Sequence, residues 1–313
     1  MKSGFVTIVG RPNVGKSTLL NAILGEKIAI ASSKPQTTRN TVRGIYTRLP
    51  EGEKHPEESG KVPADGGCQL VFLDTPGIHK PHNKLGAYMT DTALKSLSGV
   101  DSILFLVDSE PEEGKGDAFI LERLKAVETP KILVINKIDT IGPDAFKRIY
   151  DYYEKTGVFR EIFGCSALDG TNVRDIVRAV EKYMPEGPMY FPEDMVTDHP
   201  MRFLVSEIIR EKVLLYLSDE VPHGVAVEIE SYEELNGLTR IGAVIYCERK
   251  THKGIIIGKE GKKLKGIGKA ARLEIEELTG TKVFLQLWVK VKENWRDSDF
   301  ALSNFGYAAE KDE

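Results

Sequence analysis

The sequence has 313 residues, of which 41% are hydrophobic and 29% are charged, and its formal net charge is −4. This composition is typical of a globular protein with a hydrophobic core, and the length suggests two domains. A protein whose whole surface binds nucleic acid is usually basic, so any nucleic-acid site in this chain must be local.

The three cysteines, Cys68, Cys165 and Cys247, do not have the spacing of a metal site or of a disulfide framework. No apolar run approaches the roughly 18 residues that a membrane-spanning helix needs, and the first residues do not resemble a signal peptide. We therefore expect a cytoplasmic, monomeric protein. The sequence leaves open a peripheral contact with the inner face of the cell membrane.

Short apolar runs alternate with amphipathic segments in the first 184 residues. We expect strands at 5–9, 41–49, 69–73, 103–107, 131–135 and 162–165, and helices at 16–24, 85–97, 118–126, 144–155 and 173–183. Continuous apolar strands between helices indicate a mostly parallel α/β sheet covered on both faces. Ligands of such sheets bind beyond the carboxyl ends of the strands.

Residues 50–67 interrupt this pattern with three prolines, four glycines and five acidic residues. This composition favours a loop, and we expect a hairpin tip there. A second break is the proline-rich stretch 185–200, which we interpret as a linker. After it we expect a helix at 201–217, strands at 225–230 and 241–248, a glycine-rich turn, a helix at 262–278 and a strand at 283–292. These elements predict an α+β domain at 201–295, followed by a tail at 296–313.

The first motif is a phosphate-binding loop between a strand and a helix. It consists of Gly10, Arg11, Pro12, Asn13, Val14, Gly15, Lys16 and Ser17, in the pattern G-x-x-x-x-G-K-S, and Thr18 follows it. Backbone N–H groups of such a loop surround phosphate oxygens at the start of a helix. We expect Lys16 to reach the β- and γ-phosphates and the Ser17 hydroxyl to bind Mg²⁺.

Two further segments are expected at the same phosphates. Asp74, Thr75, Pro76 and Gly77 follow a strand, so that Asp74 can hold Mg²⁺ and the Gly77 N–H can meet the γ-phosphate. A threonine in the loop 32–40 can complete the Mg²⁺ shell only while the γ-phosphate is present. Thr38 is the first choice for this role and Thr37 the second.

The base is expected to be guanine. Asn136, Lys137 and Asp139 follow another apolar strand, and a carboxylate at Asp139 can accept hydrogen bonds from N1–H and N2–H₂ of guanine. Adenine would leave that carboxylate poorly paired. A weaker motif, Ser166, Ala167 and Leu168, follows the next strand, and the Ala167 N–H can meet guanine O6.

The second domain carries a glycine-containing turn that is suited to RNA. It consists of Ile257, Gly258, Lys259, Glu260, Gly261, Lys262 and Lys263. A G-x-x-G turn between two helical segments lets a nucleic-acid backbone approach closely, as in a KH domain. Residues 249–292 hold twelve Lys or Arg and four Asp or Glu, a net charge of +8, which is the local basic region sought above.

Together these motifs resemble those of the Era family of bacterial GTPases, within the group that includes TrmE and EngA. The resemblance covers nearly the whole chain, including the linker residues 191–194 and the segment 285–296; the main departure is the insertion 50–67. It implies a P-loop GTPase domain at 1–184 and a type II KH domain that binds single-stranded RNA near the 3′ end of 16S ribosomal RNA. The implied role is in 16S rRNA processing and in biogenesis of the small (30S) ribosomal subunit. By the same analogy Asn13 is a candidate ligand for K⁺.

Hydrolysis is expected to depend on Lys16, Thr38 and Gly77. Ras-like GTPases have a water-positioning glutamine after the Asp-x-x-Gly motif, whereas this chain has Ile78. The resemblance implies slow intrinsic turnover that K⁺ or a partner raises.

Other interpretations stay open at this point. A TrmE-like enzyme would carry a reactive cysteine motif near the C-terminus, and EngA would need a second P-loop; neither is found. The loss of the glutamine keeps open an RNA-binding scaffold with negligible hydrolysis. A membrane-associated signalling GTPase is a further alternative.

Overall fold

The computed structural model describes residues 1–32, 34, 36–50, 66–108, 115–217 and 221–307, so most of the expected hairpin tip at 50–67 lies outside the described residues. The chain divides into two compact units. Unit 1 comprises Met1–Ala29, Thr38–Lys80 and Met89–Asp198. Unit 2 comprises Ile30–Thr37, Pro81–Tyr88 and His199–Glu313. No described helix is long and apolar enough to cross a membrane.

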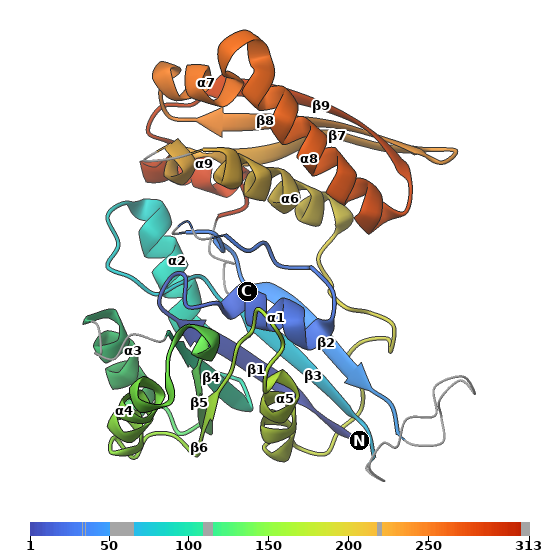
Figure 1. Cartoon of the computed structure of the whole chain (residues 1–313). Helices are drawn as coiled ribbons and strands as arrows, with labels where there is room; N and C mark the ends of the chain where they lie inside the picture. Colours follow the sequence, from blue (N-terminus) through green and yellow to red (C-terminus); the bar gives the residue numbers. More distant parts are fainter. Residues whose placement is uncertain (33, 35, 51–65, 109–114, 218–220, 308–313) are drawn as a thin grey trace. The chain divides into compact units, whose positions relative to one another are not determined.

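Unit 1 contains a six-stranded sheet in the order β2-β3-β1-β4-β5-β6 (Figure 1). Its strands are β1 (Lys2–Gly10), β2 (Val42–Arg48), β3 (Cys68–Asp74), β4 (Ser102–Val107), β5 (Lys131–Ile135) and β6 (Glu161–Gly164). Only the edge strand β2 is antiparallel to its neighbour. The predicted mostly parallel sheet is therefore confirmed.

Helices cover both faces of this sheet because successive strand residues point to opposite faces. They are α1 (Lys16–Leu24), α2 (Lys84–Lys95), α3 (Lys115–Lys125), α4 (Pro143–Glu154) and α5 (Val173–Lys182). Alternate residues of β4 and β5 pack with α2, α3 and α4 in one buried cluster. In Figure 1 α1 and α5 lie on the other face. The P-loop joins β1 to α1 at the carboxyl end of β1.

The proline-rich stretch runs along the edge of the same sheet instead of standing free. Gln69 on β3 donates to the carbonyl of Phe191 at 2.9 Å, and the Ile45 N–H on β2 donates to the carbonyl of Val196 at 2.8 Å. The Ile45 bond satisfies a backbone N–H of the edge strand β2 that would otherwise be open to pairing. Residues up to Asp198 therefore belong to unit 1.

Unit 2 has a three-stranded sheet in the order β7-β8-β9, with β7 and β8 antiparallel and β8 and β9 parallel. Its elements are α6 (Met201–Tyr216), β7 (Ala226–Leu235), β8 (Leu238–Cys247), α7 (Lys250–Ile257), α8 (Lys262–Thr279), β9 (Lys282–Val291) and α9 (Asp299–Asn304). Short 3₁₀ turns occur at Ile138–Thr140, Val221–Gly224, Lys259–Gly261 and Trp295–Asp297. Helices α6, α7 and α8 pack on one face of the sheet.

The structure differs from the sequence prediction at two places in unit 2. Strands β7 and β8 are longer than predicted, because they continue to a two-residue hairpin turn at Asn236 and Gly237, both at positive φ. An Asn-Gly pair is a typical sequence signal for such a turn. The segment after β9 also folds onto the unit. Trp295 is fully buried and its Nε1 donates to the carbonyl of Gly224 at 2.9 Å.

Candidate nucleotide site and RNA-binding turn

The P-loop geometry depends on a glycine at position 15. Gly15 has a φ of 97°, and a Cβ there would lie 2.2 Å from the side-chain nitrogen of Asn136. Any other residue would therefore be strained and would clash. Asn13 also has a positive φ, of 67°, a conformation that asparagine tolerates better than most residues.

Lys16 opens α1 and is buried at 6% exposure. Its Nζ donates to the backbone carbonyl of Arg11 at 2.9 Å and to that of Gly10 at 3.3 Å. Burial lowers the pKa of Lys16 to about 8, and the nearby Asp74 carboxylate opposes this shift. The ammonium group is thus held inside the loop, where a phosphate would offer it a stronger partner than two carbonyls.

Three oxygen-bearing side chains converge beside Lys16. The Ser17 hydroxyl donates to Asp74 Oδ2 at 2.6 Å and lies 2.8 Å from the Thr38 hydroxyl, which is 3.5 Å from the same carboxylate oxygen. Asp74 is fully buried and its Oδ1 has no hydrogen-bond partner among the described residues. Burial raises the pKa of Asp74 to about 6, and Lys16 opposes this.

This cluster fits Mg²⁺. Hydroxyl and carboxylate oxygens are the ligands that Mg²⁺ prefers, and an unpaired buried carboxylate oxygen is costly unless a cation or donor meets it. The neighbouring Thr37 is used differently, because its hydroxyl donates to the carbonyl of Lys34 at 2.6 Å and contacts Ser32 at 2.9 Å. Of the two threonines, only Thr38 is bonded to the Asp74 carboxylate.

Gly77 and Ile78 follow Asp74 close to the P-loop. A Cβ on Gly77 would lie 2.6 Å from the backbone nitrogen of Pro12, so the backbone approach requires glycine. The Ile78 N–H donates to the carbonyl of Gly10 at 3.1 Å. The Ile78 side chain is 1% exposed and packs in the core with residues such as Val9 and Phe105. It therefore faces apolar side chains rather than solvent.

Asn136 connects the segments predicted to bind the base with the P-loop through two hydrogen bonds. Its Nδ2 donates to the carbonyl of Val14 at 2.8 Å, and its Oδ1 accepts the N–H of Ala167 at 3.0 Å. The Ala167 N–H, which we expected to meet guanine O6, thus has a protein partner in this structure. Asp139 and Leu168 are exposed, which leaves the Asp139 carboxylate accessible to a base.

The sequence predicts Arg11 as a residue of the phosphate-binding loop, and the structure shows how its side chain is held. Its guanidinium forms ion pairs at 2.8 Å with Asp108, which follows β4, and with the buried Asp117 on α3. These bonds fix the backbone of the P-loop from outside. The acidic partners lie about 100 residues away in sequence, so no local pattern could reveal them.

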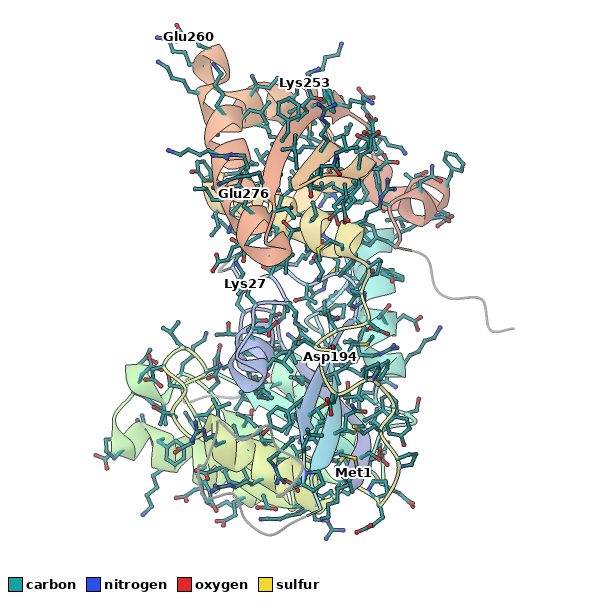
Figure 2. The ribbon with its side chains drawn as sticks, turned by 90° about the vertical axis from the view of Figure 1, so that its right-hand side faces the viewer. Met1, Lys27, Asp194, Lys253, Glu260 and Glu276 are labelled. Atoms are coloured by element: carbon teal, nitrogen blue, oxygen red, sulfur yellow. The ribbon has the colours of Figure 1, made fainter. Side chains whose placement is uncertain are left out.

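The predicted turn in unit 2 connects α7 to α8. Gly258 has a φ of 71°, and a Cβ there would lie 2.7 Å from the Cβ of Lys263. Lys259, Glu260 and Lys262 are exposed. Figure 2 places Glu260 at the opposite end of α8 from Glu276, so the turn projects from the unit with its charged side chains accessible.

Comparisons with known proteins agree with the two predicted kinds of domain. Residues 5–137 match the family model described as a 50S ribosome-binding GTPase, and residues 220–296 match a KH domain. GTPase Era of Alkaliphilus oremlandii is 54% identical over 308 residues, covering 98% of this chain and 99% of that protein. GTPase Era of Clostridioides difficile is also 54% identical, over 98% of each chain.

This chain belongs to the GTPase Era family. Its fold matches a crystal structure of Aquifex aeolicus Era bound to GDP and AlF₄⁻, with a TM-score of 0.89 and 42% identity over 99% of this chain and 100% of that one. An Era structure in complex with MgGDPNP and nucleotides 1506–1542 of 16S ribosomal RNA matches with the same score, identity and coverage. The predicted family, both fold classes and the GTPase activity are thereby confirmed.

For an Era-family GTPase, the geometry explains why the motifs are spaced as they are. The strands β1, β3, β5 and β6 run parallel and end at one edge of the sheet. Each motif follows one of these ends, so segments more than 100 residues apart in sequence come together at one edge of the sheet. The insertion 50–67 joins β2 to β3 and leaves the flanking motif residues in register.

Proposed function

We propose that this chain binds Mg²⁺-GTP through residues 10–18, 74–77, 136–139 and 166–168 and couples its hydrolysis to binding of RNA near the 3′ end of 16S ribosomal RNA during assembly of the small ribosomal subunit. The observation that carries the nucleotide half is the cluster of Ser17, Thr38 and Asp74 beside the buried Lys16. Family membership supports the RNA half, because a relative covering the whole chain has been solved with that RNA.

In this proposal each motif has one task. Lys16 pairs with the β- and γ-phosphates, and Ser17, Thr38 and Asp74 hold Mg²⁺. When bound, Mg²⁺ supplies charge neutralisation at the phosphate oxygens. The Gly77 N–H donates to the γ-phosphate, and Asp139 accepts from the guanine edge.

Hydrolysis is proposed to be slow without help. Ile78 has no polar group and is buried in the core, so it cannot orient the attacking water. Asn13, exposed in the P-loop at positive φ, is the proposed K⁺ ligand. We expect faster GTP turnover in KCl than in NaCl at matched ionic strength; equal rates would overturn the K⁺ assignment.

Binding of RNA is proposed at the turn formed by residues 257–263. The turn carries exposed lysines at its tip, and its glycines permit close approach of a phosphate backbone. We expect single-stranded RNA with splayed bases as the ligand. The affinity should fall steeply with salt, because phosphate contacts release counterions.

The decisive experiment is capture of RNA from a cell lysate with the full chain. The test variant is Lys259→Glu/Lys262→Glu, which reverses two exposed charges and leaves Gly258 intact, since a Cβ at that glycine would clash. The matched control is Lys147→Glu/Lys155→Glu, which makes the same charge change at exposed residues of unit 1, outside the basic region 249–292. All three proteins must bind GDP equally.

We expect wild type and control to enrich the 3′ end of 16S rRNA. The test variant should capture at least tenfold less of this RNA. Equal capture by all three proteins would show that the turn is not the RNA site. An RNA-binding scaffold without useful hydrolysis is the second candidate, favoured by the buried Ile78. Multiple-turnover phosphate release with and without the captured RNA separates the two.

The proposal also includes a cytoplasmic location, a monomeric state and contact with the inner face of the cell membrane. Cell fractionation, light scattering and co-sedimentation with anionic vesicles test these three statements in turn. Co-sedimentation no greater than that of a protein with no membrane affinity would remove the membrane contact.

A further inference from the structure

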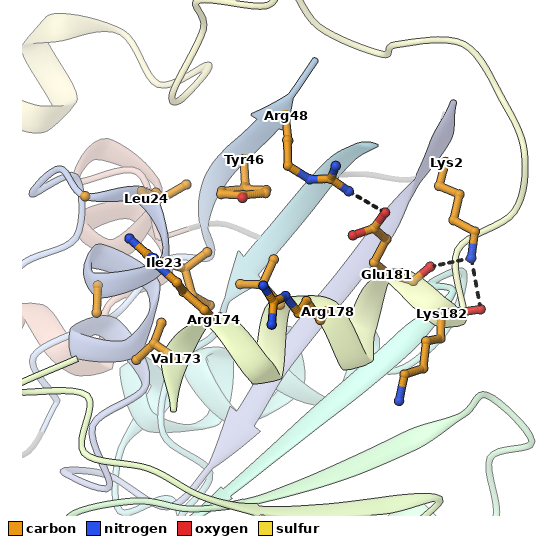
Figure 3. A pocket seen from close by; sticks show the side chains of 13 residues that line it. Lys2, Ile23, Leu24, Tyr46, Arg48, Val173, Arg174, Arg178, Glu181 and Lys182 are labelled. Carbon is orange, nitrogen blue, oxygen red and sulfur yellow. Dashed lines mark hydrogen bonds and ion pairs between the residues drawn. The ribbon is translucent and has the colours of Figure 1, made fainter. Parts of the chain in front are cut away.

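Unit 1 contains a second cavity that the nucleotide motifs do not use. It has a volume of about 820 Å³ and lies between α1, α5 and the edge strand β2 (Figure 3). This volume is within the range of about 300–1,000 Å³ that is usual for small-molecule sites. Every residue that lines it belongs to unit 1.

The cavity is distinct from the P-loop site. Helix α1 begins at Lys16 in the P-loop, but the cavity is lined by Ala22, Ile23 and Leu24 at its other end. Similarly, β1 ends at Gly10 in the P-loop, whereas Lys2 at its start lines the cavity. Eight residues of helix separate Lys16 from Leu24, a distance of about 12 Å.

The walls of the cavity are basic. Helix α5 contributes Arg174, Arg178 and Lys182, spaced at four residues along one face, and β2 contributes Arg48. Like charges four residues apart on a helix destabilise it by about 0.2–0.5 kcal/mol per pair. A bound anion would offset this repulsion.

Some of these cations are fixed and others are available. Arg48 is paired with Glu181 at 2.6 Å, and Lys2 donates to the carbonyl of Glu181 at 3.0 Å. Arg174 has no ion pair or hydrogen bond to any residue that the structure describes, and Arg178 has only an exposed contact with Asp175 at 3.6 Å. In Figure 3 both guanidinium groups project over the space between α1, α5 and Tyr46.

The floor of the cavity is apolar. Ile23, Val173 and Val177 are buried beneath it, and the partly buried ring of Tyr46 closes one side. Burial is the main reason that the pKa of Tyr46 is raised, so the phenol stays neutral near the two arginines. An inorganic anion alone would leave this apolar surface uncovered, whereas a ligand with a flat ring would cover it.

We propose that this cavity is a second binding site for a nucleotide, whose phosphates pair with Arg174 and Arg178 while its base lies against Tyr46 and the valines of α5. Planar guanidinium groups suit phosphate because they can donate two parallel hydrogen bonds. The site is independent of the guanine motifs and of the turn in unit 2. Its ligand can be a free nucleotide or a nucleotide of an RNA strand, which share this chemistry.

The test is titration calorimetry with the full chain loaded with one equivalent of Mg²⁺-GDP and freed of excess nucleotide. ADP is the probe, because the P-loop site is occupied and Asp139 disfavours adenine there. The test variant is Arg174→Gln/Arg178→Gln, which changes two exposed side chains. The matched control is Lys147→Gln/Arg148→Gln, which removes two exposed charges from α4. Tyr46→Leu tests the contact with the base.

We expect one ADP to bind the GDP-loaded wild type and the control equally, with at least tenfold weaker binding to the arginine variant. Tyr46→Leu should weaken ADP severalfold but leave inorganic pyrophosphate unchanged. No binding of ADP at millimolar concentration, or equal binding to the arginine variant, would overturn the proposal. Pyrophosphate binding as tightly as ADP would also overturn it, since the base would then not be recognised.

A short oligoadenylate distinguishes the two sources. If it binds no more tightly than ADP, the ligand is a free nucleotide. If it binds at least tenfold more tightly through the same two arginines, the cavity holds a nucleotide of an RNA strand. If an acidic peptide binds the cavity more tightly than both ADP and oligoadenylate, and so displaces ADP at a lower concentration, the cavity is a protein-docking groove. That result would contradict the nucleotide assignment.

Discussion

Ile78 occupies a position that is catalytic in Ras-like GTPases, but in this fold its side chain is part of the core. It follows the Asp-x-x-Gly motif, where Ras-like GTPases carry a water-positioning glutamine, yet its side chain is 1% exposed and packs in the core of unit 1. A polar group at this position would lose its hydrogen bonds with water.

We therefore predict that Ile78→Gln destabilises the protein without raising GTP turnover. Burial of an unpaired amide should lower the free energy of unfolding by about 2–4 kcal/mol. Urea unfolding and phosphate release measure the two effects. Ile78→Leu, which keeps an apolar side chain, should cost less than about 1.5 kcal/mol. A faster Ile78→Gln enzyme would show that the side chain can reach the attacking water.

We predict that Asp74, the proposed Mg²⁺ ligand, makes Mg²⁺ binding pH-dependent. Its pKa is raised by burial to about 6 in the folded, nucleotide-free protein, above its ordinary value of 3.8. Between these values the folded state binds more protons than the unfolded state, so the contribution to stability falls as pH rises through this window, by about 3 kcal/mol in all. Mg²⁺ requires the ionised carboxylate, and its binding should release a proton below pH 6.

The expected outcome is that Mg²⁺ strengthens GDP binding progressively less below pH 6, by up to about tenfold per pH unit. The measurement is the affinity for GDP in Mg²⁺ divided by the affinity for GDP in EDTA, at each pH between 5 and 8. Dividing by the affinity in EDTA corrects for the effect of GDP protonation on binding. A ratio that stays constant down to pH 5 would contradict the raised pKa of Asp74.

At the scale of elements, the turn between α7 and α8 depends on two glycines for different reasons. Gly258 and Gly261 both have positive φ, of 71° and 74°. A Cβ would collide with Lys263 at Gly258, but it would meet open space at Gly261. The pattern G-x-x-G does not reveal this difference.

Gly258→Ala should lower the free energy of unfolding by about 2–3 kcal/mol, because it adds a clash to the backbone strain. Gly261→Ala should cost only about 1–2 kcal/mol, the strain of a left-handed residue. Hydrogen exchange of the α8 amides and urea unfolding measure these effects. Equal costs at the two positions would indicate that α8 shifts to accommodate the alanine.

At the scale of the whole molecule, the loop that contains Thr37 and Thr38 belongs to both units. Thr38 contacts Ser17 in unit 1, whereas Ile30–Thr37 is part of unit 2. There Glu211 on α6 accepts the N–H of Ala31 at 3.0 Å, and the buried Arg210 donates to the carbonyls of Gln36 and Thr37. Lys212 then links Glu211 to Glu274 on α8, the helix that follows the proposed RNA-binding turn.

We predict that Glu211→Gln weakens the effect of nucleotide on RNA affinity. Coupling between two sites typically amounts to a factor of about 5–150. The wild type should bind RNA at least fivefold differently with a GTP analogue and with GDP, and this ratio should approach one in Glu211→Gln. Glu274→Gln is the control, because it removes an ion pair with the same lysine, Lys212, and changes no hydrogen bond to Ile30–Thr37. Equal ratios in all three proteins would contradict coupling through α6.

Most elements of unit 1 could be predicted because its strands are continuous apolar runs and its motifs sit at their ends. The prediction was weaker in unit 2. There α7 was expected only as a helical segment before the turn. Strands β7 and β8 continue to a hairpin turn at Asn236–Gly237 that the prediction did not include, so both strands are longer than expected. Short amphipathic elements give a weak periodic signal, and packing against a neighbouring sheet decides whether they form.

The sequence by itself determined the family, the two fold classes and the GTPase chemistry, because backbone-binding loops need specific glycines and phosphate and guanine need specific charged groups at fixed spacing. Only the tertiary structure decided which threonine meets Asp74, that Ile78 faces the core, and that the linker borders β2. It alone brought Arg174 and Arg178 over an apolar cavity beside Tyr46. These features depend on contacts between residues far apart in the chain, which no local pattern encodes.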